Sequence, residues 1–122
     1  MSKFVIRRVA SGVKFDLLAA NGQVVATSEV YDTKAACEKG IASVRKLAPD
    51  AKVEDQTLAG YPTLTNPKFE IYLDKAGAYR FRLKARNGKI IAISESYRAK
   101  ASCENGVESV RRNAPGAEYT EE

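Results

Sequence analysis

The sequence predicts an α+β fold in which tandem β-β-β-α-β repeats form one antiparallel sheet with two helices packed on one face. Three observations lead to this prediction. The chain contains an internal duplication, each copy begins with segments in which apolar and polar residues alternate around an Asn-Gly pair, and each copy then changes to the 3.6-residue period of an amphipathic helix.

The duplication has a constant offset of 66 residues, and residues 15–51 share 20 identities over 37 positions with residues 81–117. We therefore interpret residues 1–55 as a first repeat and residues 68–122 as a second. The segment between them, residues 56–67, holds two of the four prolines and is expected to be a linker. We expect the two repeats to form one compact domain.

Each repeat starts with three strand-like segments. In the second repeat, apolar and polar residues alternate over 69–74 and again over 79–86, which is typical of half-buried strands. Asn87-Gly88, and Asn21-Gly22 in the first repeat, predict a two-residue type I′ turn into the third strand. That turn pairs position 85 with 90 and position 83 with 92. One sheet face then carries Phe81, Leu83, Ala85, Ile90 and Ala92, matched by Phe15, Leu17, Ala19, Val24 and Ala26.

A helix is expected after the third strand. One helical stripe carries Cys37, Ile41, Val44 and Ala48 with Gly40 beside them, and the second repeat has Cys103, Val107, Val110, Ala114 and Gly106 there. Asp32 or Thr33 can cap the first helix and Pro49 ends it, whereas the second lacks an obvious cap. Short fourth strands are expected at 52–55 and 118–121. One unit cannot bury its own sheet face, so we expect two units side by side, related by a pseudo-two-fold axis, with the other sheet face open to solvent.

The repeated motifs resemble those of the YegP-like family, small bacterial and archaeal proteins of unknown function. They are Ala-Xaa-Asn-Gly-Xaa-(Val/Ile)-(Val/Ile)-Ala-Xaa-Ser-Glu-Xaa-Tyr at 19–31 and 85–97, followed by Lys-Ala-Xaa-Cys-Glu-Xaa-Gly at 34–40 and 100–106. The resemblance covers nearly the whole chain. It implies tandem β(3)-α-β motifs in a single sheet, C-terminal strands exchanged between the halves, and single-unit members that assemble as dimers. It implies no activity and no site residue.

Composition removes several kinds of chemistry. The chain has no histidine, which excludes the commonest general base and every Ser-His or Cys-His nucleophile. Cys37 and Cys103 are too few for a zinc site or a disulfide framework, so we expect reduced thiols. We expect no metal, no cofactor and no catalytic residue. No signal-peptide pattern or long apolar run is present, so we expect a cytoplasmic protein that does not enter a membrane.

The net charge of +5 is mildly basic, and one surface concentrates it. The outward face of the Asn-Gly hairpin in the second repeat is expected to carry a candidate anion-binding set: Arg80, Arg82, Lys84, Arg86, Lys89 and Tyr72. Such a face suits phosphates with a base stacked on it. The alternative is an ordinary solvated strand face, with Arg80 paired to Glu95 and the rest neutralised by Glu70 and Asp74. In the first repeat Asp16, Leu18, Ala20 and Gln23 replace four of the cations.

A second candidate is a polar corner present in both repeats: Ser28, Glu29, Tyr31 and Lys34, matched by Ser94, Glu95, Tyr97 and Lys100. It is either a duplicated small-molecule site or a structural corner, with Tyr packed over it, Glu29 facing Lys14, and Lys34 paired with Glu38. On balance the sequence predicts a non-enzymatic binding or interaction module. The alternative function is binding of RNA or single-stranded DNA through the basic hairpin face. The partner, nucleic acid or protein, is not identified, and we expect a monomer.

Overall fold

The computed structural model describes residues 1–122 and contains one eight-stranded sheet with two helices. The first repeat forms β1 (Lys3–Val9), β2 (Gly12–Leu18), β3 (Val24–Thr27), α1 (Lys34–Leu47) and β4 (Lys52–Asp55). The second forms β5 (Lys68–Leu73), β6 (Tyr79–Lys84), β7 (Ile90–Ile93), α2 (Lys100–Asn113) and β8 (Glu118–Glu121). The predicted α+β fold with tandem repeats is confirmed.

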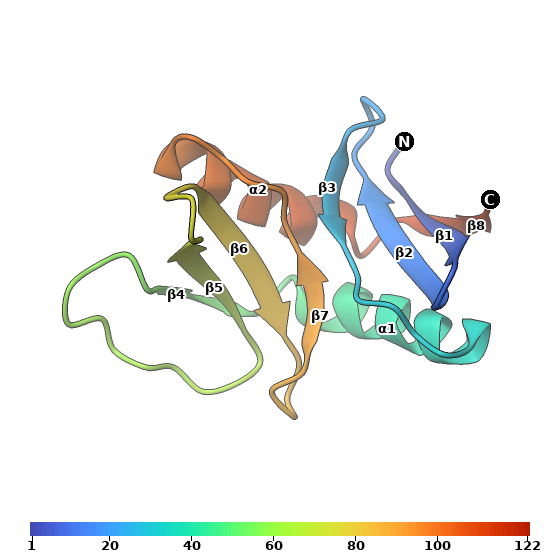
Figure 1. Ribbon diagram of the computed structural model, residues 1–122, viewed down its shortest axis with the longest axis horizontal. Helices are drawn as coiled ribbons and strands as arrows, with labels where there is room; N and C mark the ends of the chain where they lie inside the picture. The colour runs from blue at the N-terminus through green and yellow to red at the C-terminus, as the bar shows by residue number, and fades with distance from the viewer.

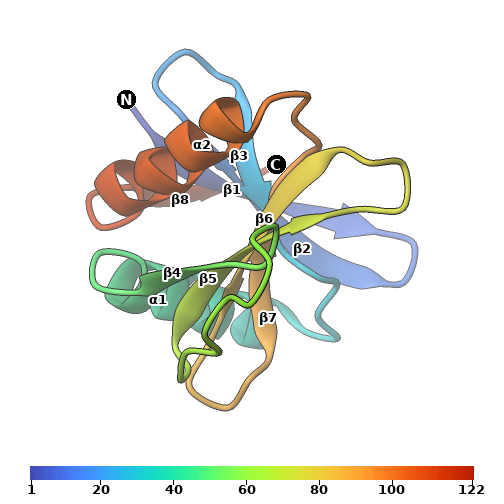
Figure 2. The same cartoon turned by 90° about the vertical axis from the view of Figure 1, so that its left-hand side faces the viewer.

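The strand order is β4-β5-β6-β7-β3-β2-β1-β8 (Figure 1). Each strand of one repeat lies as far from the β3–β7 junction as its equivalent in the other repeat. A pseudo-two-fold axis therefore passes between β3 and β7. Only Thr27 and Ile93 are paired across that junction. Both helices lie on the same side of the sheet (Figure 2).

The C-terminal strands are exchanged between the halves, as the family resemblance implies. β4 of the first repeat pairs with β5, and β8 of the second repeat pairs with β1. Both of these pairs are parallel, so the sheet is mixed and not wholly antiparallel as predicted. The physical reason is the connection: a helix separates each fourth strand from its own hairpins, and it returns the chain to the far edge of the other repeat in the parallel direction.

The two Asn-Gly turns differ from the prediction. The Gly88 amide donates to the Ala85 carbonyl and the Ala85 amide donates to the Lys89 carbonyl, both over 2.9 Å, which makes a three-residue loop. Gly88 has φ +81° and Asn87 has no positive φ, so the turn is type I followed by a glycine bulge, not type I′. The first repeat forms the same loop, with Gly22 at φ +83°.

This extra loop residue changes the pairing near the turn. Leu83 faces Ala92 as predicted, but Ile90 faces Lys84 and not Ala85. The register shifts at a bulge between Leu83 and Lys84. As a result Ile91 is buried and Ile90 is only half-buried, the reverse of the prediction. Farther from the turn, the predicted inward residues Phe15, Leu17, Phe81 and Leu83 are all buried.

The helix stripes are as predicted. Cys37, Ile41 and Val44 are at most 1% exposed, as are Cys103, Val107 and Val110. The Thr33 hydroxyl accepts a hydrogen bond from the Ala36 amide and caps α1, while Ala99 begins α2 without a side-chain cap. Each helix packs on strands of both repeats, since α1 contacts β2 and β7 and α2 contacts β6 and β3. The core therefore runs without a break across the pseudo-two-fold axis.

Candidate functional site

Arg80, Arg82, Lys84 and Arg86 form a basic ladder along β6 and just after it, on the outer face of the sheet. Carboxylates of neighbouring residues neutralise most of this ladder. The Arg80 Nε lies 2.8 Å from Asp74, and the Arg82 Nε lies 2.6 Å from Glu70. The Lys84 ammonium is 3.4 Å from the same Glu70. The Arg82 guanidinium also stacks over the Tyr72 ring, 4.3 Å from its centroid. The expected pair of Arg80 with Glu95 is absent; Arg80 donates to the Ser94 carbonyl.

Beneath this ladder lies a charge cluster made of Glu54, Lys68 and Glu70. All three residues are at most 6% exposed although they stand on the face opposite the helices. The Lys68 ammonium lies 2.7 Å from Glu54 and 3.2 Å from Glu70. The Leu64 backbone, from the segment between β4 and β5, donates to Glu54 and accepts from Lys68. This part of the outer face is therefore covered, whereas the sequence predicts that the face is open to solvent.

The cluster is held in its ionised form. Burial tends to raise the pKa of Glu54, but hydrogen bonds from Lys68, Gln56 and the Leu64 amide outweigh it and hold that pKa at about 2. Burial likewise tends to lower the pKa of Lys68, and its contacts with Glu54 and Glu70 raise that pKa above its usual value. A buried lysine between two carboxylates is an internal ion pair and not a free anion site.

Two members of the predicted anion-binding set remain free of ion pairs. Arg86 and Lys89 flank the β6–β7 turn, and both side chains are exposed. Carboxylates pair with Arg80, Arg82 and Lys84 but with neither of these two residues. The free positive charge of the hairpin is thus concentrated at its turn.

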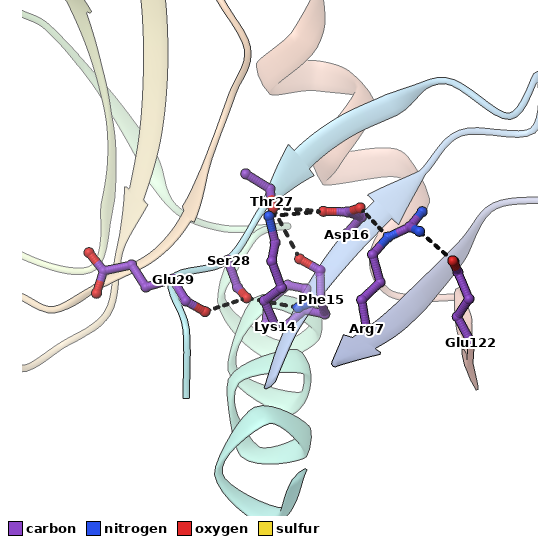
Figure 3. Close-up of polar contacts among 8 residues, drawn as sticks. All are labelled: Arg7, Lys14, Phe15, Asp16, Thr27, Ser28, Glu29 and Glu122. Atoms are coloured by element: carbon purple, nitrogen blue, oxygen red, sulfur yellow. Dashed lines mark hydrogen bonds and ion pairs between the residues drawn. The ribbon is translucent and has the colours of Figure 1, made fainter. Parts of the chain in front are cut away.

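The same face of the first repeat has different chemistry. Asp16 accepts a hydrogen bond from Arg7 at 2.7 Å and another from Thr27 at 2.7 Å, and it lies 3.8 Å from the Lys14 ammonium (Figure 3). Arg7 also pairs with Glu122 at the end of the chain. The Glu29 side chain points away from Lys14 (Figure 3), so the pair suggested by the hairpin pattern does not form. A carboxylate at position 16, where β6 has Arg82, leaves no basic ladder here.

The serines of the polar corner satisfy backbone groups. The Ser28 hydroxyl accepts from the Phe15 amide over 2.9 Å and donates to the Glu29 carbonyl over 2.7 Å. Ser94 makes the same two contacts with Phe81 and Glu95. Both serines are at most 6% exposed, so they complete the sheet where the third strand leaves the ladder.

The tyrosines of the corner lie against the helix glycines. Tyr31 stacks on Phe15 with ring centroids 6.4 Å apart, and Tyr97 stacks on Phe81 at 6.5 Å. A Cβ atom at Gly40 would lie 2.3 Å from the Tyr31 hydroxyl, and one at Gly106 would lie 2.6 Å from that of Tyr97. The glycine inside each helix therefore makes room for the tyrosine of the same repeat.

The corner lysines hold the exchanged strands. Lys34 at the start of α1 pairs with Glu121 of β8 at 2.9 Å, and Lys100 at the start of α2 pairs with Asp55 of β4. The suggested pair of Lys34 with Glu38 does not form. Sequence alone pairs a helical lysine with its neighbours in the same helix, and only the strand exchange brings the distant carboxylates within reach.

Sequence reasoning missed a related role for Arg45 and Arg111. Arg45 of α1 donates to the Ala117 carbonyl before β8, at 2.9 Å from its Nε, and Arg111 of α2 donates to the Ala51 carbonyl before β4. Each guanidinium also stacks over a core phenylalanine, Phe4 or Phe69. The recurrence of the two arginines at equal positions was the available signal, but it gave no indication of the acceptor.

The two cysteines are free and fully buried in the core. Burial raises the pKa of Cys37, and burial together with Glu104 and Asp55 raises that of Cys103 to about 11. Both thiols therefore stay protonated near neutral pH, as expected for small apolar core residues. No group of three or more histidine, cysteine or carboxylate side chains converges as a metal site.

Known proteins are similar to this chain over either one repeat or nearly its whole length. Residues 10–55 and 74–121 each match a domain of unknown function, DUF1508. A UPF0339 protein of Bordetella pertussis is 40% identical over 114 residues, which covers 93% of this chain and 89% of that protein. A UPF0339 protein of Treponema denticola is 59% identical over 54 residues, 44% of this chain but 93% of its own length.

Solved structures agree with these matches. The solution structure of yegP from E. coli, described as a protein of unknown function, superposes with a TM-score of 0.81 at 30% identity, covering 98% of this chain and 91% of that one. A UPF0339 protein of Shewanella oneidensis gives a TM-score of 0.80 at 27% identity, covering 98% and 90%. Neither helix of this chain is long and apolar enough to cross a membrane.

Proposed function

The chain belongs to the DUF1508 family, whose function is unknown, and we propose that it is a non-enzymatic binding module. The observation that carries this proposal is the use made of the polar residues common to both repeats. Ser28 and Ser94 satisfy the backbone, Lys34 and Lys100 hold the exchanged strands, and Tyr31 and Tyr97 fill the space above the helix glycines. The duplication of these residues follows from the duplication of the fold and needs no reaction to explain it.

The two halves supply each other's fourth strands within one chain, which favours a monomer that presents its surface to a different kind of partner. The free, buried thiols fit the cytoplasmic location expected from the sequence. A reproducible turnover that disappears in Lys100→Ala, with the fold retained, would contradict the binding-module proposal.

A second candidate function is recognition of RNA or single-stranded DNA through the second hairpin. The observation that favours it is the exposed, unpaired state of Arg86 and Lys89 in a chain of net charge +5. Arg82 and Lys84 contribute less, because Glu70 lies within 3.4 Å of both. Tyr72 is engaged by Arg82.

A fluorescence-anisotropy titration of labelled single-stranded RNA and DNA with the wild-type protein tests the second candidate. We expect binding at low salt that weakens steeply as salt rises, because cation–phosphate contacts release counterions. Absence of binding to both polymers at low salt would remove nucleic acid as the ligand. Arg82→Glu and Lys84→Glu are poor test substitutions, since each would place a carboxylate beside the buried Glu70.

A further inference from the structure

A groove runs along α1, between the helix and the β6–β7 hairpin of the other repeat. It consists of three adjoining cavities of about 480, 260 and 230 Å³ that share lining residues. The first and second share Ser43, Ala85 and Asn87, and the second and third share Lys46, Leu47 and Arg86. The groove thus extends from the strand-to-helix corner to the end of α1, and both repeats form it.

Cations stand on both sides of this groove. Lys39 and Lys46 come from α1, and Arg86 and Lys89 come from the hairpin. All four side chains are exposed and none takes part in an ion pair. Two carboxylates, Glu29 and Asp50, also line the groove. Four cations against two carboxylates leave a positive lining.

The spacing of the cations suits a ligand that carries negative charge at more than one place. Lys39 and Lys46 are seven residues apart, which is about two helical turns and roughly 10 Å along the axis. Between the cations the lining is apolar, with Val30, Ile90, Ile91 and Leu47, and the Asn87 side chain supplies an amide.

The fold itself does not require these cations. The pseudo-two-fold axis relates this packing to that of α2 beside the β2–β3 hairpin, where α2 packs on β3 as α1 packs on β7. There Asn105, Ala20 and Gln23 replace Lys39, Arg86 and Lys89, and only Lys46 has a basic counterpart, Arg112. Since the same packing forms with neutral residues at three of these four positions, most of the charge of the groove is available for a ligand.

We infer that the groove between α1 and the β6–β7 hairpin binds the backbone of single-stranded nucleic acid, with Lys39, Lys46, Arg86 and Lys89 on its phosphates. A nucleic acid alternates phosphates with flat rings, which matches cations on the sides and apolar residues with one amide on the floor. An acidic polypeptide carries no such ring beside each charge. This inference rests on the second candidate function and gives that function a site.

The test compares two double variants in the anisotropy titration, with RNA and DNA strands of about twelve nucleotides. Lys39→Glu/Lys89→Glu changes one cation on each side of the groove. Gln23→Glu/Arg112→Glu adds similar negative charge to the equivalent surface of the other half, beside α2 and the β2–β3 hairpin. We expect the first variant to lose about tenfold or more in affinity and the slope of log K against log salt to shrink by about 1.4. The second is expected to bind like wild type. Circular dichroism and thermal melting check that both variants fold.

Amide chemical-shift changes in the wild-type protein keep the test independent of any variant. We expect the oligonucleotide to shift the amides of Lys39, Ser43, Asn87 and Lys89, and not those of Asn105 and Gln23. Shifts confined to the equivalent surface of the other half would overturn the inference.

The outcomes separate the site from the function. Binding by wild type that survives Lys39→Glu/Lys89→Glu, or that both variants weaken equally, overturns the groove and leaves nucleic-acid binding in place. Absence of wild-type binding at low salt overturns both. Displacement of the oligonucleotide by polyglutamate at equal charge concentration would overturn the inference in favour of an acidic polypeptide.

Discussion

Gly40, inside α1, is a residue at which the fold leaves no room for a side chain. Glycine inside a helix costs about 1 kcal/mol relative to alanine, so Gly40→Ala would be stabilising if the space were open. The added Cβ would instead lie 2.3 Å from the Tyr31 hydroxyl and 3.2 Å from Phe15, whose rings are stacked together. Overpacking of a core typically costs about 1–3 kcal/mol, so the steric effect is the larger one.

We therefore expect Gly40→Ala to lower the free energy of unfolding by about 1–2 kcal/mol, measured by urea denaturation. Gly116→Ala is the matched control, because no atom lies within 4 Å of the Cβ that it would add. Tyr31→Phe combined with Gly40→Ala should recover part of the loss by removing the nearest atom. An unchanged or higher stability in Gly40→Ala would contradict this account of the helix glycines.

Glu54 makes acid stability a test of the buried charge cluster. Its pKa is about 2 in the folded protein against 4.5 ordinarily, so the folded state favours the ionised form. The resulting stabilisation is complete above pH 4.5 and is lost as the pH falls towards 2. We expect the difference in unfolding free energy between wild type and Glu54→Gln to shrink over this range, because protonated Glu54 then resembles glutamine. Denaturation curves at a series of pH values measure it, and a constant difference would show that the cluster does not depend on the carboxylate charge.

At the scale of the elements, the sequence predicted what depends on local pattern. The helix stripes, the Thr33 cap and the strand faces far from the turns are set by apolar spacing within one segment. The predicted type I′ turns at Gly22 and Gly88 were wrong, because an Asn-Gly pair fits both a type I′ turn and a type I turn with a glycine bulge. Flanking residues do not distinguish these two turns.

The sequence also failed to predict most interaction partners of the candidate site residues. Arg82 and Glu70 are neighbours in a predictable strand pair, and their neutralisation was an expected alternative. By contrast, Lys34 finds Glu121 and Arg45 finds the Ala117 carbonyl through a strand that arrives from the other repeat. The groove cations Lys39 and Lys46 also escaped notice, because only the packing of α1 on β7 brings them opposite the hairpin.

Arg45 offers a test of how the exchanged strand β8 is held. Arg45→Met keeps a long apolar side chain near Phe4 but removes both the hydrogen bond to the Ala117 carbonyl and the charge. Hydrogen bonds from charged groups contribute about 1.5–3 kcal/mol. We expect faster amide hydrogen exchange in β8, by about tenfold or more, with little change in β5 and β6. Arg112→Met is the control, because Arg112 also lies in the last turn of its helix, α2, but is exposed. Equal exchange in β8 for wild type and Arg45→Met would show that the hydrogen bond from Arg45 does not hold that strand.

At the scale of the whole molecule, duplication has made two halves that depend on each other. Each half lacks a fourth strand beside its own first strand, and each helix covers a strand of the other half. The outer faces have nonetheless diverged: the Glu54–Lys68 pair joins the halves at one edge of the sheet, and at the other edge Thr120 lies beside Val5. A shared core thus leaves the surface between α1 and the β6–β7 hairpin, to which both halves contribute, free to acquire the charge on which the proposed binding rests.

This dependence predicts the behaviour of the halves as separate chains. Residues 1–55 alone would expose the edge of β1 and the helix face that packs on β7, and residues 68–122 would expose the equivalent surfaces, so neither should fold as a monomer. Each should form a dimer by reciprocal exchange of its last strand, consistent with relatives about half this length.

Mixed together, the two peptides should favour a 1:1 complex, because only that pairing places Lys68 between Glu54 and Glu70. Size-exclusion chromatography with light scattering measures the masses, and a Glu54→Gln peptide should weaken the preference for the mixed pair. A folded monomeric half would contradict the argument, since it would show that one repeat can cover its own sheet.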